Sequence, residues 1–479
     1  SQFLDSCLPC QLLTCSHINP PFQHQSHIDL TPFCINIIMA DEGEALPVPG
    51  VPFYNMPVEM QSQIGKLVDN KTLYNAIRVN KEWFHRLIDL LWHTTSIEKL
   101  QSGSKTYTST NRRQIYARRI RVGTLKSSDH TAGLLHGVTF QVIKRLEIQA
   151  TWVHLAHEML IPFLHPTLQH LTLNGSFYLT ATLLASFRNC TELHTISFSG
   201  EVTTSDNDCL LKFLGKHKPL RSLTFGGWLR GASGHDITLS VAEVLLRRGD
   251  LVHLSLRRPL IEYLGETHTD IDPQSMVPLP TNTQLQSLSI NGEGPVVAVF
   301  LSVVAASLQH LTLSLGFPSE KIFDQVSVLT TLVHLSLNWN QTTKPMTSDH
   351  FDALCALENL KYLCLGWRSE HGATLGWLTD DKLADWISHF AGLHTLQLDW
   401  EECSLTEASI VAISRSCPDL ITCNLGWKHN LDEWKSLTEF APLFPKLKAL
   451  QLGKVEHISF AAPLVRYFVK SMQLIDVVF

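Results

Sequence analysis

Long apolar runs are missing from this chain of 479 residues. The longest uninterrupted apolar stretches fall well short of the roughly 18 residues that a membrane-spanning helix requires, so no such helix is predicted. The first residues also lack the Lys- or Arg-bearing segment ahead of an apolar block that marks a secretory signal. A net charge of only -6 gives no global field toward nucleic acid or membrane. We therefore expect a cytoplasmic or nuclear protein that binds neither.

Cysteine is sparse and irregularly placed. Four of the 11 cysteines precede residue 35, and the other seven are scattered singly between Cys190 and Cys423, so no disulfide framework is predicted. Residues 1–38 contain no Lys or Arg, and Met39 after them is the expected native start. We expect residues 1–55 to be disordered or extraneous. The alternative is zinc binding by thiolates and imidazoles of this segment, namely Cys7, Cys10, Cys15, His17, His24 and His27. Their compressed spacing matches no zinc finger, so no metal site is predicted.

Catalytic motifs are missing as well. The chain has no Gly-rich phosphate loop, no G-x-S-x-G, no H-E-x-x-H, and no paired Cys-x-x-Cys within the repeats described next. We therefore predict that the protein is not an enzyme and holds no cofactor.

What the sequence does have is a repeat, L-x-x-L-x-L, of which Leu168-Gln-His-Leu-Thr-Leu173 is a clean copy. Thirteen copies, the first and last of them looser, begin at residues 143, 168, 193, 220, 251, 285, 308, 332, 360, 393, 420, 447 and 474. Side chains alternate along an extended backbone, so the fourth and sixth positions share the buried face of a short strand. Leu383, Trp386, Ile387 and Phe390 keep the spacing of a helix that buries one side.

A strand followed by a helix, repeated in this way, predicts a parallel sheet. One such unit cannot bury its own apolar face, so the units must stack. The predicted fold class is α/β: a leucine-rich-repeat solenoid over residues 142–479, with strands on the concave face and helices on the convex face. Residues 96–141 are expected to be a linker with a degenerate first repeat at Ile120 and Val122.

Residues 56–95 form a separate helical module in this interpretation. Two helices are predicted, one with an apolar stripe from Met60 to Val68 and one with a stripe from Phe84 to Leu91. The order Met56-Pro57, spaced Ile and Leu, Val79-Asn-Lys-Glu-Trp83 and Leu91-Trp92 resembles the F-box. Met56 stands where that pattern usually has Leu, and Asn80 where it usually has Cys.

With the repeats, the chain resembles an F-box/leucine-rich-repeat protein of fungal type. The resemblance implies a substrate receptor of a Skp–cullin–F-box ubiquitin ligase, with the Skp adaptor, the cullin and a protein substrate as partners. By matching position it implies these adaptor-binding residues: Met56, Pro57, Ile64, Leu67, Leu73, Val79 and Trp83. The alternative is a non-catalytic interaction scaffold without a ubiquitin role, in which the module only caps the solenoid.

The third and fifth positions of the repeat are expected to face the concave side. The third is His170, His253, His310 and His334, and the fifth is Thr172, Ser255, Thr312 and Ser336. We predict that His253, His310 and His334 contribute to substrate binding, with a charge that changes near neutral pH. The alternative is repeat duplication that left a solvent-facing residue in place. A run of arginines, Arg112, Arg113, Arg118, Arg119 and Arg121, is interpreted as solvated surface.

Tryptophan occupies the eighth position of four consecutive copies, at Trp339, Trp367, Trp400 and Trp427. If the strand ends at the sixth position, these rings line the concave rim, where tryptophan often anchors an interface. If the strand continues, alternation turns them into the core. We predict partial exposure and a role in substrate binding.

Overall fold

The computed structural model describes residues 57–79, 81–102, 110–127, 135, 137–150, 157–217, 219–231, 238–260, 284–292, 294–304, 307–316, 320–339, 347–367, 375–400, 403, 405–427, 429–430, 444–453, 455–456 and 476–478. These residues fall into two compact units, Ser1–Leu87 and Ile88–Phe479, whose boundary lies inside helix α4. None of the described helices combines the length and hydropathy that crossing a bilayer would take.

The described residues of the first unit form three helices where the sequence predicted two: α2 (Val58–Leu67), α3 (Asn70–Ala76) and the start of α4 (Lys81–His93). Helix α3 begins after Asp69, whose carboxylate accepts the Thr72 amide at 2.8 Å and so satisfies one of the free N–H groups of the first turn. Helices α2 and α4 are joined by a hydrogen bond of 2.8 Å from the Arg86 guanidinium to the side chain of Gln61, which is buried.

Among its described residues, the second unit is built on one sheet of fifteen strands whose pairings are all parallel. β1 and β2 precede residue 142, so the sheet starts upstream of the predicted solenoid boundary. The other thirteen strands each belong to one predicted copy of the repeat. In sheet order the strands are β1 (Thr94–Ser96), β2 (Val122–Ser127), β3 (Arg145–Ala150), β4 (His170–Asn174), β6 (Thr195–Phe198), β8 (Ser222–Phe225), β10 (His253–Leu260), β11 (Ser287–Gly292), β12 (His310–Leu315), β13 (His334–Trp339), β14 (Tyr362–Trp367), β15 (Thr395–Trp400), β16 (Thr422–Leu425), β18 (Ala449–Leu452) and β20 (Asp476–Val478).

A recurring pair of backbone hydrogen bonds fixes where each strand begins. The carbonyl of the second residue of a repeat accepts the amides of the second and third residues of the next repeat. Arg121, for example, accepts Lys144 at 2.8 Å and Arg145 at 3.0 Å. The same double acceptance occurs at twelve carbonyls: those of residues 121, 144, 169, 194, 221, 252, 286, 309, 333, 361, 394 and 421. This pair of hydrogen bonds makes the third residue of each copy the first residue of its strand.

From that start, alternation sends the fourth and sixth positions to one side of the sheet and the third and fifth to the other. In β12 the burial follows this order, because Leu311 and Leu313 are fully buried while His310 is exposed and Thr312 half-buried. The first leucine of each complete copy, such as Leu308, is buried as well. One continuous apolar core therefore runs between the sheet and the helices.

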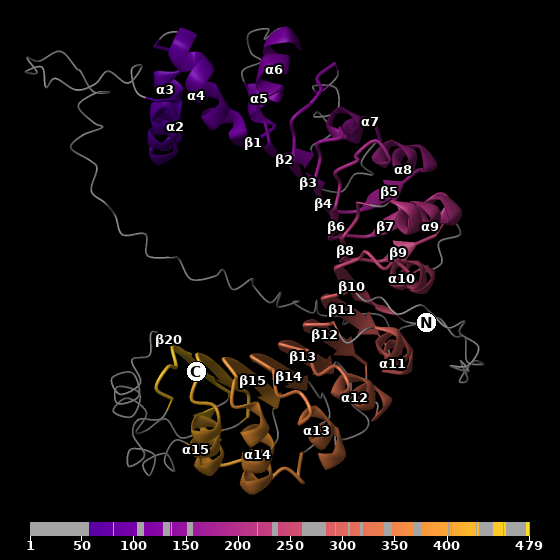
Figure 1. The fold of residues 1–479 in the computed structure, drawn as a ribbon, viewed down its shortest axis with the longest axis vertical. Coiled ribbons are helices and arrows are strands. Elements are labelled where there is room, and N and C mark those ends of the chain that lie inside the picture. Colours follow the sequence, from indigo (N-terminus) through magenta and orange to yellow (C-terminus); the bar gives the residue numbers. More distant parts are fainter. Residues whose placement is uncertain are drawn as a thin grey trace, which may run out of the picture. The chain divides into compact units, whose positions relative to one another are not determined.

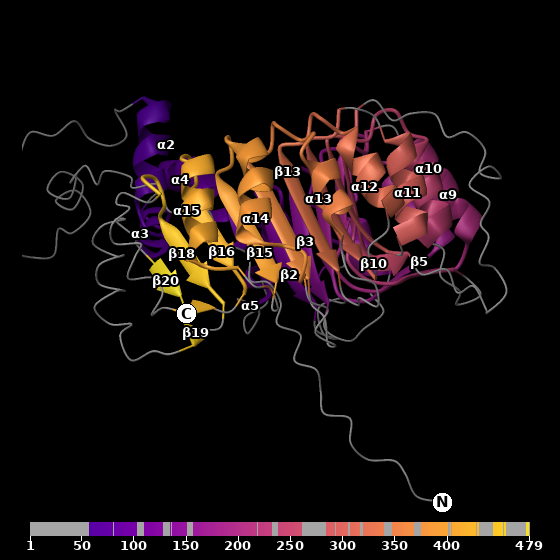
Figure 2. The same ribbon diagram turned by 90° about the horizontal axis from the view of Figure 1, so that it is seen from below.

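Helices cover the outer side of this sheet, and the strands lie on the inner side (Figures 1 and 2). The solenoid thus has the α/β leucine-rich-repeat architecture that the sequence predicted. The helices are α5 (Lys99–Ser102), α6 (Thr110–Ala117), α7 (His157–Leu160), α8 (Ala181–Phe187), α9 (Asn207–Lys216), α10 (Thr238–Leu246), α11 (Gly294–Val303), α12 (Glu320–Ser327), α13 (Ser348–Leu354), α14 (Asp380–Ile387) and α15 (Glu407–Ser416), with 3-10 turns η3 (Ile161–Phe163) and η4 (Ser388–Phe390).

Two smaller parallel sheets follow the main strands. One joins β5 (Phe177–Leu179), β7 (Val202–Thr204) and β9 (Leu229–Arg230), and the other joins β17 (His429–Asn430) and β19 (Val455–Glu456). Glycine occupies the turns into the first of these, at Gly175, Gly200 and Gly227. A Cβ at Gly200 would overlap the Gly175 carbonyl, so the close approach of successive repeats requires glycine there.

We expect Gly200→Ala to lower the free energy of unfolding by about 1–3 kcal/mol, because the added methyl meets backbone rather than a flexible side chain. Urea denaturation followed by circular dichroism measures this change. Gly249→Ala is the matched control, since a Cβ there meets nothing within 4 Å. Equal stability of the two variants would contradict the close packing of these turns.

Candidate functional site

The inner face of the second unit carries the predicted histidines on neighbouring strands. Their register across the sheet is His253 on β10, Ser287 on β11, His310 on β12, His334 on β13 and Tyr362 on β14. We call these five residues the histidine row. His253 and His310 are exposed, as the alternation predicts. Ser287 between them leaves a gap one strand wide between two exposed imidazoles.

The rest of the row is packed ring against ring. The His334 imidazole stacks on the Tyr362 ring with centroids 3.9 Å apart and planes at 10°. On its other side the His310 ring lies at 5.8 Å. His334 is therefore half-buried. Its ring packs beside His310 and is less accessible to a partner than the rings of His253 and His310.

These contacts change the expected electrostatics. Burial lowers the pKa of His334 to about 4, with the positive charge of His310 adding to the effect. Burial also lowers the pKa of His253, again with a contribution from His310. A pKa of about 4 keeps His334 neutral at pH 7. The prediction that the charge of His334 changes near neutral pH is therefore wrong, because desolvation disfavours the imidazolium ion, whereas the same expectation for His253 and His310 stays a prediction.

His170 belongs to a different place on the same face. It lies on β4 and meets the edge of the His194 ring at a centroid distance of 4.5 Å. Burial lowers its pKa, and the charges of His194 and Arg145 lower it further. The four histidines of the third position thus form two groups, one on β4 and one on β10 to β13.

Hydroxyl side chains lie beside the histidine row at the fifth position. Thr312 and Ser255 are half-buried, and Ser336 is buried and accepts a hydrogen bond of 3.1 Å from the Asn338 amide. A neutral, hydrogen-bonding surface of this kind suits the polar groups of a protein partner.

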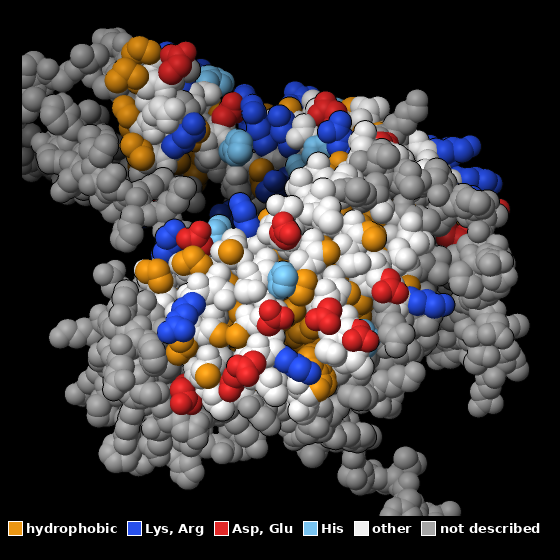
Figure 3. All heavy atoms as spheres, turned by 60° about the horizontal axis from the view of Figure 1, so that its bottom comes forward, with side chains coloured by type: hydrophobic (Ala, Val, Ile, Leu, Met, Phe, Trp, Pro, Cys, Tyr) orange, Lys and Arg blue, Asp and Glu red, His pale blue; other side chains and the backbone are white. Residues whose placement is uncertain are grey.

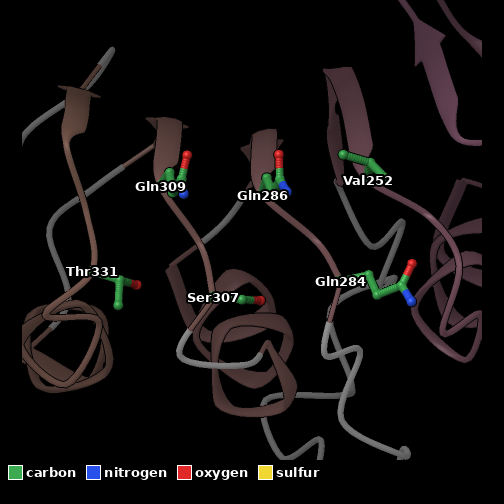
Figure 4. Close-up of a pocket in the computed structure, with 6 residues that line it drawn as sticks. All are labelled: Val252, Gln284, Gln286, Ser307, Gln309 and Thr331. Atoms are coloured by element: carbon green, nitrogen blue, oxygen red, sulfur yellow. The ribbon is translucent and has the colours of Figure 1, made fainter.

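A cavity of about 340 Å³ opens at the starts of β10 to β13 (Figure 4). Its lining alternates between the residue before the first leucine and the second residue of the repeat: Val252, Gln284, Gln286, Ser307, Gln309 and Thr331. No lining side chain is charged. Sequence reasoning missed this cavity because the search for surface residues stopped at the strand positions, although Gln286 and Gln309 repeat in register.

The predicted exposure of the tryptophans is wrong. Trp339, Trp400 and Trp427 are at most 1% exposed. Strands β13 and β15 run two residues past the third leucine, so Trp339 and Trp400 have the parity of the fourth and sixth positions and point into the core. Strand β16 ends at Leu425, and Trp427 is buried although it lies two residues beyond the end of that strand. Trp339 packs on Phe323, and Trp400 stacks on Trp427 at 6.2 Å. These three side chains are core, not a binding strip.

Trp367, the fourth tryptophan, lies in the same register as the other three. The Trp367 backbone pairs with Trp339 on one side and Trp400 on the other. Its side chain lies outside the described part of the chain, and its role in substrate binding remains a prediction.

The helical module places its predicted residues unevenly. Pro57, Leu67 and Val79 are exposed, whereas Ile64 and Trp83 are half-buried. Leu73, predicted to face an adaptor, is instead 5% exposed, because α3 turns it inward together with Ala76. Met56 lies outside the described residues.

Sequence reasoning missed two exposed apolar residues of this module, Met60 on α2 and Tyr74 on α3. Met60 belongs to the apolar stripe of the first predicted helix, and it is 52% exposed. Figure 3 shows hydrophobic side chains gathered on this part of the surface. No cluster of three or more possible metal ligands occurs among the residues whose placement is described.

Comparison with known proteins gives no family: no family model matches the chain, and no curated protein does. Solved structures do resemble it. The Rad7 and Elc1 complex of yeast aligns with a TM-score of 0.44 and 19% identity, covering 85% of this chain and 94% of that one. A leucine-rich-repeat protein of Leptospira interrogans aligns with a TM-score of 0.41 and 14% identity, covering 79% and 94%. Such distant likenesses carry no argument about function.

Removing the ring of Trp400 should cost core stability. We expect Trp400→Ala to lower the free energy of unfolding by about 3–5 kcal/mol, the range for deleting a buried aromatic side chain. Denaturant unfolding followed by circular dichroism measures the loss. Trp228→Ala serves as the control, because Trp228 is only half-buried and should cost less. A Trp400→Ala variant as stable as the parent would restore the exposed interpretation.

Proposed function

We propose that the protein is the substrate receptor of a Skp–cullin–F-box ubiquitin ligase, in which the helical module binds the Skp adaptor and the solenoid binds the target. The observation that carries this proposal is the concentration of exposed apolar side chains on the module. Of the eight large hydrophobic residues that are exposed among the described residues, four lie between residues 57 and 79: Met60, Leu67, Tyr74 and Val79.

Such exposure is costly for a small helical unit unless a partner covers it. Leu67 is 72% exposed and Val79 is 65% exposed. Fully burying a side chain of either kind contributes about 1.5–3 kcal/mol. Isolated exposed leucines are ordinary, but four large apolar residues within one short segment are typical of an interaction surface.

The F-box resemblance supports the same surface from the sequence. Leu67, Val79 and Pro57 match F-box positions and are exposed, so three of the residues that the resemblance implies are accessible to an adaptor. Ile64 and Trp83 are half-buried and would support this surface from its edge. A unit whose only role was to cap the solenoid would not need Leu67 and Val79 in solvent.

For the target, we propose the histidine row as the contact surface. His253 and His310 are exposed on either side of Ser287, and the amide-lined cavity opens beside them at Gln286 and Gln309. A partner side chain seated in the gap would gain ring contact on two sides and hydrogen bonds below. His334, fixed by Tyr362, would hold His310 in position.

We expect Leu67→Asp together with Val79→Asp to weaken Skp adaptor binding at least tenfold, because each change removes burial of about 1.5–3 kcal/mol at the interface. Isothermal titration calorimetry of the full chain with a purified Skp adaptor measures the affinity. Both residues are exposed, so folding should be unaffected.

Val328→Asp is the matched control, since Val328 is 64% exposed but lies in the solenoid. It should leave adaptor affinity unchanged. Adaptor binding by the double variant equal to that of the parent chain would contradict the proposed surface. A parent chain that binds no Skp adaptor would contradict the ligase role itself and favour the scaffold alternative.

A further inference from the structure

Positive charge is concentrated at the N-terminal end of the solenoid. Residues 88–150 contain ten Lys and Arg against four Asp and Glu, an excess of six positive charges, whereas the rest of the chain has 28 against 40. In Figure 3, Lys and Arg side chains gather over the first strands, while acidic side chains are spread over the C-terminal repeats. The modest net charge of the whole chain hides this separation.

The structure arranges part of this charge in a line. The second residue of the repeat, directly before each strand, is Arg121, Lys144, Gln169, His194 and Arg221 in five successive repeats. We call these five residues the pre-strand row. Each member after Arg121 donates its backbone amide to the carbonyl of the previous member, at 2.8 Å from Lys144 to Arg121 and 2.9 Å from Arg221 to His194. Neighbouring members are therefore about 4.7–4.9 Å apart along the sheet.

The positively charged side chains of the row are accessible to a partner. Arg121, Lys144 and Arg221 are exposed, as is Arg145 next to Lys144, and none of the four forms an ion pair with a described residue. Arg119, by contrast, forms an ion pair within the chain, with Asp89 at 2.9 Å. Arg121 and Lys144 are neighbours in the row, and Arg145 follows Lys144, so these three like charges repel one another and an anionic partner would relieve that repulsion.

Two carboxylates next to the row indicate which kind of anion fits. Glu192 accepts the Gln169 amide at 2.9 Å, and Glu147, two residues after Arg145 on the same face, accepts the Asn174 amide at 2.9 Å. A polyphosphate chain carries a negative charge at every unit, so some of its phosphates would be repelled by these carboxylates. A polypeptide can place uncharged residues opposite them and carboxylates opposite the cations.

We propose that the pre-strand row binds an acidic segment of the partner protein. This proposal rests on the proposed role of the solenoid in protein binding, but not on adaptor docking by the helical module. The acidic segment lies across β2, β3, β4, β6 and β8, while the histidine row on β10 to β14 holds a neighbouring part of the same partner. The row thus selects partners by charge, and the histidine row selects by shape and hydrogen bonding.

The test uses the full chain and a short fluorescein-labelled peptide in which Glu and Ser alternate, with binding followed by fluorescence anisotropy. We expect binding that weakens as salt rises, and a loss of about tenfold for Arg121→Glu with Lys144→Glu, as two reversed surface contacts imply. The neutral pair Arg121→Gln with Lys144→Gln should show a smaller loss and keeps the test decisive if the reversed pair misfolds.

Lys361→Glu with Lys448→Glu is the matched control, because both lysines are exposed and occupy the same repeat position before β14 and β18. It should keep peptide affinity close to that of the parent chain. Equal losses in the two pairs, or no peptide binding by the parent, would overturn the proposal.

Two further outcomes would assign a different binding partner to the pre-strand row and would therefore overturn the proposal. Tighter binding of a single-stranded thymidine oligonucleotide, lost in the Arg121 and Lys144 variants, would make the row a nucleic-acid site. Self-association of the parent in sedimentation velocity, lost in the same variants, would make its occupant a second copy of the chain. Adaptor affinity measured on these variants should be unchanged, which separates this proposal from the ligase role.

Discussion

The double acceptance of backbone amides by one carbonyl in each repeat is the interaction on which the solenoid depends. It joins the second residue of one copy to the second and third residues of the next, and it recurs at twelve carbonyls from Arg121 to Ile421. Because it fixes the first strand residue, it also fixes the phase of the alternation that follows. Each copy contributes too few apolar groups to fold alone, so this link and the shared core make every repeat depend on its neighbours. The insertions that make some repeats longer lie outside the linked positions and leave the phase unchanged.

Both surfaces of the sheet follow from that phase. The fourth and sixth positions enter the core, and so does the eighth where the strand extends to it, which is why the large rings of Trp339 and Trp400 fill space under the C-terminal strands. The third and fifth positions remain on the inner face, where His253 and His310 reach solvent. The second position, just before the strand, is outside the alternation and forms its own line along the edge. The histidine row and the pre-strand row are thus two consequences of one backbone link.

Much of this architecture could be predicted from the sequence, because leucine at fixed spacing reports directly which side chains must be buried. The thirteen predicted copies all supply strands to the one sheet. What the spacing does not report is where a strand ends, and the prediction failed for Trp339 and Trp400 for that reason. Trp427 is buried beyond the end of its strand, which the spacing does not report either. Helix α3 was missed because seven residues are too few for a clear period, and its N-cap, Asp69, stands outside any apolar stripe. Leu73 was assigned to a surface by resemblance, whereas its burial depends on how α3 packs within the module. The cavity beside Gln286 and Gln309 depends on the spacing of neighbouring repeats, which no single copy contains.

Carbethoxylation of native histidines by diethyl pyrocarbonate, read by peptide mass spectrometry, tests the phase of the alternation most directly. The reagent modifies neutral imidazoles that reach solvent, so no substitution is needed. We expect rapid modification of His253 and His310 at the third position, and slow modification of His217 and His350, which are 8% and 7% exposed. If His253 and His310 reacted as slowly as those two buried histidines in the folded chain, the third position would not face solvent, and the assignment of the inner surface would be contradicted.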